Sequence, residues 1–158
     1  MTVVPPLPNR RRKANSKPSK TSAGDSALRH TGIHFMGDMP WGTHVFLFYE
    51  TAQDLLDTAA CYFEAGLKSN ELCVWAVSDP ISLQHAEGAL RRAILDFDRY
   101  QTAGRIELVA GSEWYLDGDD FDLQRITGGW RDKLNAALAR GYDGVRASGN
   151  AFWIGTKH

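Results

Sequence analysis

The chain has 158 residues, 43% of them hydrophobic, and a formal net charge of −1, which is enough apolar material for one domain with a real core. No apolar run approaches the roughly 18 residues of a membrane span, and no signal-like segment begins the chain, so we expect a cytoplasmic protein without a membrane partner. Cys61 and Cys73 both lie in apolar periodic segments, which predicts two buried free thiols.

The charges are distributed unevenly along the chain. Residues 1–32 hold seven of the 18 Lys and Arg residues but one of the 19 acidic residues. This stretch buries too little apolar surface to offset its ordering entropy, so we expect a disordered basic tail at 1–32 and a folded domain at 33–158. The tail's charge permits weak, non-specific contact with nucleic acid, although a solvated leader is the simpler interpretation. The acidic remainder disfavours nucleic-acid binding by the domain.

Four apolar runs predict strands at 44–49, 71–77, 105–110 and 144–148. Helical spacing predicts three intervening helices, at about 51–68, between Pro80 and Gly104, and at about 122–140. Thr51 followed by Asp54 has the form of a capping box that starts the first helix. The alternation predicts an α/β three-layer sandwich with a mostly parallel central sheet, because parallel strands need helical crossovers.

The junction after the first predicted strand is unfavourable for phosphate. It carries Glu50, Thr51 and Asp54, which supply negative charge and occupy a free N–H at the helix start. No glycine-rich phosphate-binding motif and no nucleophile elbow occurs in the sequence, so nucleotide and triad chemistry lose their main support. The acidic run at 117–122 lacks the ligand order of a calcium loop, and we expect a turn there rather than a metal site.

Aromatic residues gather around the predicted carboxyl ends of the strands, where open parallel sheets bind ligands. Most are expected to be core, but Trp114 and Tyr115 follow a Gly-Ser turn where a pocket wall would lie. An aromatic cavity with a few polar groups is the usual form of a small-molecule site. The candidate ligand-binding residues are His44, Tyr49, Glu50, Trp75, Trp114, Tyr115, Arg146 and Asn150, with no catalytic residue, cofactor or metal.

Five stretches carry a family resemblance: "GTHVFLFYETAQDLL", "YFEAGLKSNELCVW", "SEWYL", "GYDGVR" and "GNAFW". Together, from about Trp41 to Trp153, they resemble the MEDS domain, the methanogen/methylotroph DcmR-type sensory domain. The resemblance implies a relative of RecA/KaiC-like ATPases with a degenerate phosphate loop. It also implies sensing of small hydrocarbon derivatives in signal transduction, often beside histidine kinase or transcription-regulating modules.

The sequence departs from the family pattern at two places. Phe46 stands where the family often has the cysteine of a His-x-Cys pair, so chemistry imagined for that pair is not expected here. The chain also ends at His158, before a helix and a final strand that the resemblance implies. We therefore expect an exposed sheet edge, marginal stability and a tendency to associate.

The main hypothesis is a non-catalytic sensory domain that binds a small organic ligand and signals to a partner. Two alternatives stay open. One is a remnant nucleotide-binding enzyme using Glu50 or Asp79 as a base. The other is an interaction module whose basic tail binds DNA.

Overall fold

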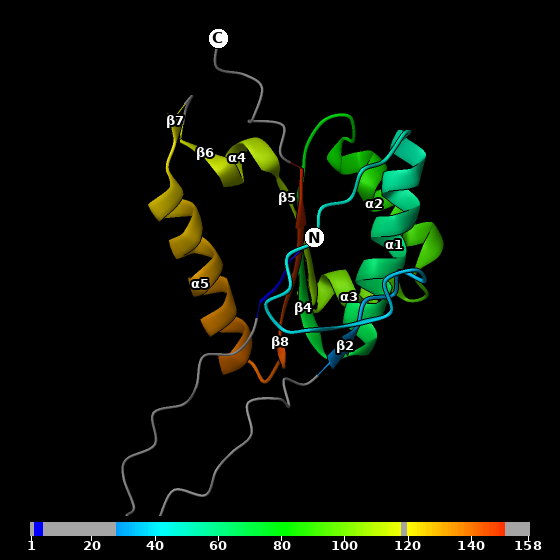
Figure 1. Ribbon diagram of the computed structural model, residues 1–158, viewed down its shortest axis with the longest axis horizontal. Helices are drawn as coiled ribbons and strands as arrows, with labels where there is room; N and C mark the ends of the chain where they lie inside the picture. Colours follow the sequence, from blue (N-terminus) through cyan, green and yellow to red (C-terminus); the bar gives the residue numbers. More distant parts are fainter. Residues whose placement is uncertain (1, 5–27, 118–119, 151–158) are drawn as a thin grey trace, which may run out of the picture.

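A computed structural model describes residues 2–4, 28–117 and 120–150 of the chain (Figure 1). The basic run at 10–13 and the terminal stretch with Trp153 lie outside the described residues, and so does the prediction of disorder for 5–27. The central sheet has the order β1–β8–β4–β5. Its strands are β1 (Thr2–Val4), β4 (Glu71–Val77), β5 (Ile106–Ala110) and β8 (Gly144–Gly149).

The three strands that follow helices are parallel, as predicted. In the register, Cys73 of β4 lies opposite Ile106 of β5 on one side and Arg146 of β8 on the other. The fourth strand, β1, is antiparallel to β8 and pairs only with Val145, Arg146 and Ala147. The sheet is therefore a parallel three-stranded core with a short antiparallel strand at one edge.

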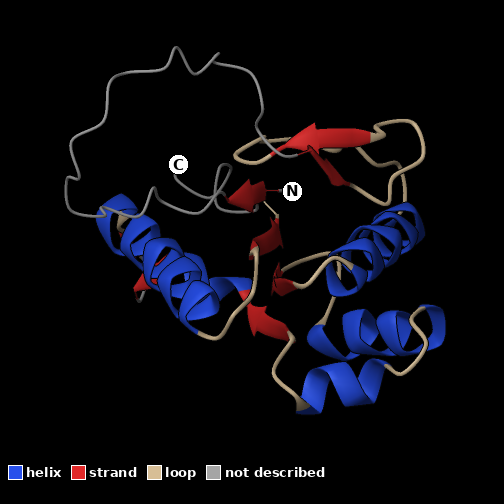
Figure 2. Cartoon of the chain, turned by 90° about the horizontal axis from the view of Figure 1, so that it is seen from below, coloured by secondary structure: helices blue, strands red, loops and turns tan. Residues whose placement is uncertain are grey.

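Helices cover both faces of the sheet and give three layers (Figures 1 and 2). One face carries α1 (Ala52–Lys68), α2 (Leu83–Ala93) and α3 (Phe97–Thr102), and the other carries α5 (Leu123–Ala139). A short helix, α4 (Gly111–Tyr115), follows β5 directly. The α/β sandwich expected from the alternation of strands and helices is confirmed.

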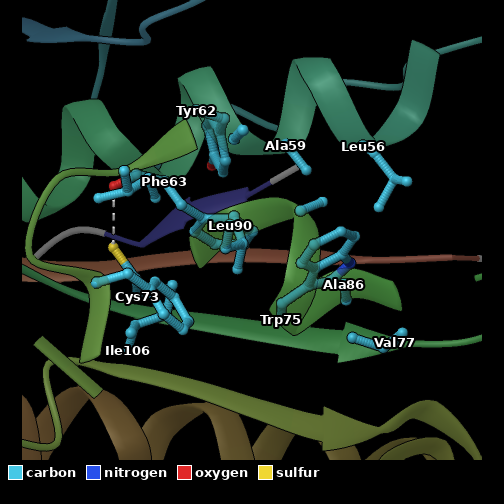
Figure 3. Packing of buried hydrophobic residues seen from close by; sticks show 14 of the residues in the cluster. Leu56, Ala59, Tyr62, Phe63, Cys73, Trp75, Val77, Ala86, Leu90 and Ile106 are labelled. Carbon is cyan, nitrogen blue, oxygen red and sulfur yellow. Dashed lines mark hydrogen bonds between the residues drawn. The ribbon is translucent and has the colours of Figure 1, made fainter. Parts of the chain in front are cut away.

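The central strand β4 is buried along its whole length and divides the core in two. Cys73, Trp75 and Val77 face α1 and α2, where they pack with Phe63, Ala59 and Leu90 (Figure 3). Leu72 and Val74 face α5, where they pack with Leu134 and Ala137. Because a strand's side chains alternate, an apolar run on both parities is what a sheet covered on both faces requires.

The first helix begins as the sequence predicts. Asp54 N–H donates to Thr51 Oγ1 at 3.2 Å, and Thr51 N–H donates to Asp54 Oδ2 at 2.8 Å. This reciprocal capping box satisfies two N–H groups that the helix leaves open. Interactions of the Asp54 carboxylate with the side chain and the backbone N–H of Thr51 also lower the pKa of Asp54.

The stretch assigned to the tail contributes to the folded structure at its end. Strand β2 (Leu28–His30) pairs with β3 (Asp38–Pro40) in an antiparallel hairpin. Thr31, in the turn, is buried and donates through its hydroxyl to the Gly37 carbonyl at 2.7 Å. Residues 2–4, as β1, and the residues from Leu28 onward are therefore folded, although they belong to the stretch predicted as a disordered tail.

The strand predicted at 44–49 is wrong. Only His44 takes part in an isolated bridge, and the segment otherwise has no regular structure. Leu47 packs against the core, while Phe46 and Phe48 are 78% and 94% exposed. The apolar run has the composition of a buried strand, but the outer edge of β8 is occupied by β1.

Three smaller expectations also need correction. The helix predicted between Pro80 and Gly104 ends at Ala93 and restarts as α3, because Ile94 is extended and Asp96 takes a left-handed conformation with φ 60°. The Gly-Ser turn before Trp114 is helical, as part of α4. Cys61 is exposed on α1, whereas Cys73 is buried as expected.

The last predicted helix is confirmed, with Asp122 as its N-cap. Asp122 Oδ1 accepts hydrogen bonds from the backbone N–H groups of Gln124 at 2.8 Å and Arg125 at 3.1 Å. Before it, β6 (Leu116–Asp117) and β7 (Asp120–Phe121) form a short antiparallel pair.

Candidate functional site

The carboxyl ends of β4, β5 and β8 meet at one edge of the sheet, which we call the rim. It is formed by the residues that follow Val77, Ala110 and Gly149. Asn150 connects two of these ends, because its side-chain amide donates to the carbonyls of Ser78 at 3.2 Å and Asp79 at 3.0 Å. A predicted site residue thus holds the end of β8 against the end of β4.

Tyr115 closes the rim from the β5 side. It is the last residue of α4 and half-buried, and burial raises the pKa of its phenol. Its hydroxyl lies so close to Gly149 that any side chain at that position would overlap it. Gly149 therefore lets Tyr115 of α4 approach the backbone of β8.

Trp114, next to Tyr115, packs on α5. Its ring centroid lies 4.5 Å from that of Trp130, and the Lys133 ammonium lies 5.9 Å from the ring centroid. The indole Nε1 is shielded from solvent and has no hydrogen-bond partner in the described part of the chain. A buried indole N–H normally finds an acceptor, so this group is an unused donor.

Trp75 lies in the core rather than on an open surface. It is 1% exposed, and its ring centroid lies 5.6 Å from that of Phe63, below α1 and α2 (Figure 3). Its Nε1 and the hydroxyl of Ser78, three residues later at the rim, are also buried without a partner among the described residues. The carboxyl end of β4 and the residue that follows it therefore carry two unused polar groups.

Arg146 is held entirely by the protein. Its Nε donates to Glu71 Oε2 at 2.6 Å and its Nη2 donates to Glu71 Oε1 at 3.1 Å. The remaining donors reach three backbone carbonyls, those of His30, Thr31 and Tyr62. A guanidinium has five N–H donors, and all five are used, so Arg146 offers none to a ligand in this structure.

His44, Tyr49 and Glu50 lie on the segment that leads into α1. All three are exposed, and the His44 ring centroid lies 6.0 Å from that of Phe46. The structure thus places Tyr115 and Asn150 at the rim. Trp114 lies beside the rim, in α4 and packed against α5, whereas Trp75 and Arg146 lie in the interior. The predicted residues do not form one continuous site.

Arg125 is a residue that the sequence argument missed. It lies in the first turn of α5, and its Nε and Nη2 are buried without a hydrogen-bond partner among the described residues. A sequence signal for it existed: a cation in the first turn of a helix faces the positive end of the helix dipole, and is unfavourable there without another reason.

The described residues contain no group of His, Cys, Asp and Glu side chains that could hold a metal ion. No helix in the described ranges is long and apolar enough to cross a membrane. A concave surface of about 500 Å³, open to solvent, is lined by residues 91–99 between α2 and α3, and contains none of the predicted site residues.

Comparisons with known proteins identify one family. Searches among curated proteins and among solved structures returned no match. A family model described as MEDS, the MEthanogen/methylotroph, DcmR Sensory domain, matches residues 43–158 and so covers most of the chain, including α1, the parallel sheet and the rim. The chain therefore belongs to the MEDS family of sensory domains.

Proposed function

We propose that this domain is a non-catalytic sensor that binds a small organic molecule at the rim and passes the signal to a partner protein. The family supplies the sensory role. The observation that carries the location is the group of unused buried polar atoms at or beside one sheet edge: Trp75 Nε1, Ser78 Oγ and Trp114 Nε1. Buried polar groups are normally paired, so unpaired ones close to the strand ends favour a ligand that completes them.

The rim also joins separate elements, as a sensor requires. Asn150 connects β8 to the end of β4, and Tyr115 connects α4 to β8. A ligand bound among these contacts would change the relative free energy of the arrangements that they hold. We propose that this change is read by a signalling partner, such as a kinase or a transcription regulator.

A thermal-shift screen of one- to three-carbon alcohols, amines, acids and halides tests the proposal. We expect at least one class to raise the melting temperature of the wild type, and the effect to be lost in Trp114→Ala. Tyr100→Ala is the matched control, because Tyr100 is also half-buried but lies in α3, before β5. Stabilisation by none of the compounds, or stabilisation that survives Trp114→Ala, contradicts the proposal.

We further propose that the junction from Glu50 to Asp54 occupies the place of a degenerate phosphate loop and does not bind nucleotide. The capping box supports this, because Asp54 and Thr51 already use the N–H groups that a phosphate would need. Calorimetry with Mg-ATP tests it. Binding tighter than about 0.1 mM, which corresponds to roughly 5.5 kcal/mol, would favour the nucleotide-binding alternative.

A further inference from the structure

Two cations lie on one row of α5, and among the described residues only one of them has an anionic partner. Arg125, Gly129 and Lys133 are four residues apart and so share one side of the helix. The Lys133 ammonium pairs with the Glu107 carboxylate of β5. Nε and Nη2 of Arg125 are buried, and no acceptor for them exists among the described residues. The row is therefore neutralised at one end and not at the other.

Arg125 is unfavourably placed for two independent reasons. Removing a guanidinium from water is costly unless an acceptor replaces the lost hydration. The first turn of α5 adds repulsion from the positive end of the helix dipole. An anion beside Nε and Nη2 would offset both effects at once, which a purely apolar ligand could not do.

Trp114 lies against the same row. A methyl group at Gly129 would lie 3.6 Å from Cζ2 and 3.7 Å from Cη2 of the Trp114 ring. The indole therefore packs against Gly129, which has no side chain and lies between Arg125 and Lys133 in the row. Its Nε1, in the five-membered ring and bonded to the same carbon (Cε2) as Cζ2, is the unused donor described above. The unpaired donors of Trp114 and Arg125 thus belong to one side of α5.

We propose that Arg125 and Trp114 bind the carboxylate of a small organic acid, an assignment that rests on the proposed sensory function and names its ligand class. The guanidinium fork matches a carboxylate in a bidentate geometry, and the indole N–H supplies a further donor. A monoanion would balance Arg125, the cation of this row that has no anionic partner among the described residues. The adjacent rings of Trp114 and Trp130, tilted by 56° to each other, offer an apolar surface for a short hydrocarbon chain.

Titrations with matched probes test this assignment. The probes are acetate, propionate and butyrate, the alcohols of the same chain lengths, and inorganic phosphate, all at constant ionic strength. The readout is the Trp114 indole N–H resonance, identified by its loss in Trp114→Phe, together with the melting temperature. We expect carboxylates to shift the resonance and raise the melting temperature, and their affinity to fall at least about tenfold in Arg125→Gln.

Two further variants make the result specific. Arg131→Gln removes the same charge from an exposed position on the same helix, and should leave carboxylate affinity unchanged. Arg125→Lys keeps the charge without the fork and should bind more weakly than the wild type. Without ligand, Arg125→Gln should melt at the same temperature as the wild type or higher, because it removes a half-buried cation that has no partner among the described residues.

Several results would overturn the inference. Carboxylate affinity that is equal in Arg125→Gln removes Arg125 from the site. Phosphate binding as tight as carboxylate binding would show a general anion site. A sharp drop in melting temperature for ligand-free Arg125→Gln would mean that a carboxylate of the chain itself neutralises Arg125. If alcohols bind in a Trp114-dependent way and acids do not, the proposed function stands and this assignment fails. If no probe binds, both fail.

Discussion

Arg146 and Glu71 form a bidentate ion pair in which both side chains are completely buried, with Nε 2.6 Å from Oε2 and Nη2 3.1 Å from Oε1. Arg29 adds a third charge at the edge of this pair, 3.1 Å from Glu71 Oε1. The two partners come from adjacent parallel strands, β8 and β4. The guanidinium of Arg146 also donates to backbone carbonyls of the β2–β3 hairpin and of α1.

Arg146→Met should therefore destabilise the domain by about 3–5 kcal/mol, because it leaves the Glu71 carboxylate buried without its main partner. Urea unfolding measures this. Arg92→Met, on the exposed surface of α2, is the control and should change the free energy of unfolding by less than about 0.5 kcal/mol. A loss below about 1 kcal/mol for Arg146→Met would show that the buried ion pair contributes little to the stability of the domain.

The two thiols should differ sharply in reactivity. Cys61 is exposed, whereas Cys73 is buried and burial raises its pKa, so that its thiolate is scarce. A thiol reagent such as DTNB should titrate one cysteine in the native protein and two in denaturant. Cys61→Ser should abolish the native reaction. Equal rates for both thiols would contradict the burial of Cys73.

The capping box should make the stability of α1 depend on pH. Interactions with the side chain and the backbone N–H of Thr51 lower the folded-state pKa of Asp54 below its ordinary value of 3.8. A lowered folded-state pKa adds stability above the unfolded-state value, and that stability is lost as the pH falls through the folded value. Asp54→Asn should therefore be less stable than the wild type at about pH 7. The difference in the free energy of unfolding should vanish at about pH 2. Parallel stability profiles would contradict the role of the ionised carboxylate.

Thr51 can be tested separately through its hydroxyl. Thr51→Ala removes the acceptor for the Asp54 N–H and should cost about 1 kcal/mol in thermal or urea unfolding. Thr51→Ser keeps that acceptor and should lie close to the wild type. Equal losses for both substitutions would point to the methyl group rather than the cap.

Exposed aromatic side chains should make the domain associate. Phe46 and Phe48 are 78% and 94% exposed on a segment whose composition is that of a buried strand. Exposed apolar residues in extended segments are sites of intermolecular pairing. Phe46→Ser together with Phe48→Ser should lower the average mass measured by light scattering. Leu95→Ser, which removes an equally exposed apolar residue between α2 and α3, should have little effect.

The elements that the sequence predicts well are those with a long, regular hydrophobic pattern. The helices at 52–68 and 123–139 and the strands at 71–77, 106–110 and 144–149 follow from periodicity and capping residues, because these signals are local. The segment at 44–49 failed for the opposite reason. Its composition favours a strand, but strand formation depends on a free neighbouring edge, which a single sequence does not reveal.

The location of Arg146 was harder to predict, because a charged residue in an apolar strand can either contact a ligand or form a buried ion pair. Arg146 interrupts an apolar strand, which favours either a ligand contact or a buried pair. Its partner Glu71 lies 75 residues earlier, so only the strand pairing shows which of the two applies. Asn150 and Tyr115 were placed correctly at the strand ends, because the topology of a parallel sheet brings those ends together.

The contacts of Arg146 join segments that are synthesised far apart in time. Its hydrogen bonds to the carbonyls of Thr31 and His30 span 115 and 116 residues. The hairpin of β2 and β3 leaves the ribosome early, but its anchor emerges only with β8. Until β8 has been synthesised, the hairpin lacks its hydrogen bonds to Arg146, and Glu71 has no partner on β8. Strand β8, the last one among the described residues, therefore completes both the pairing of Glu71 and the attachment of the β2–β3 hairpin.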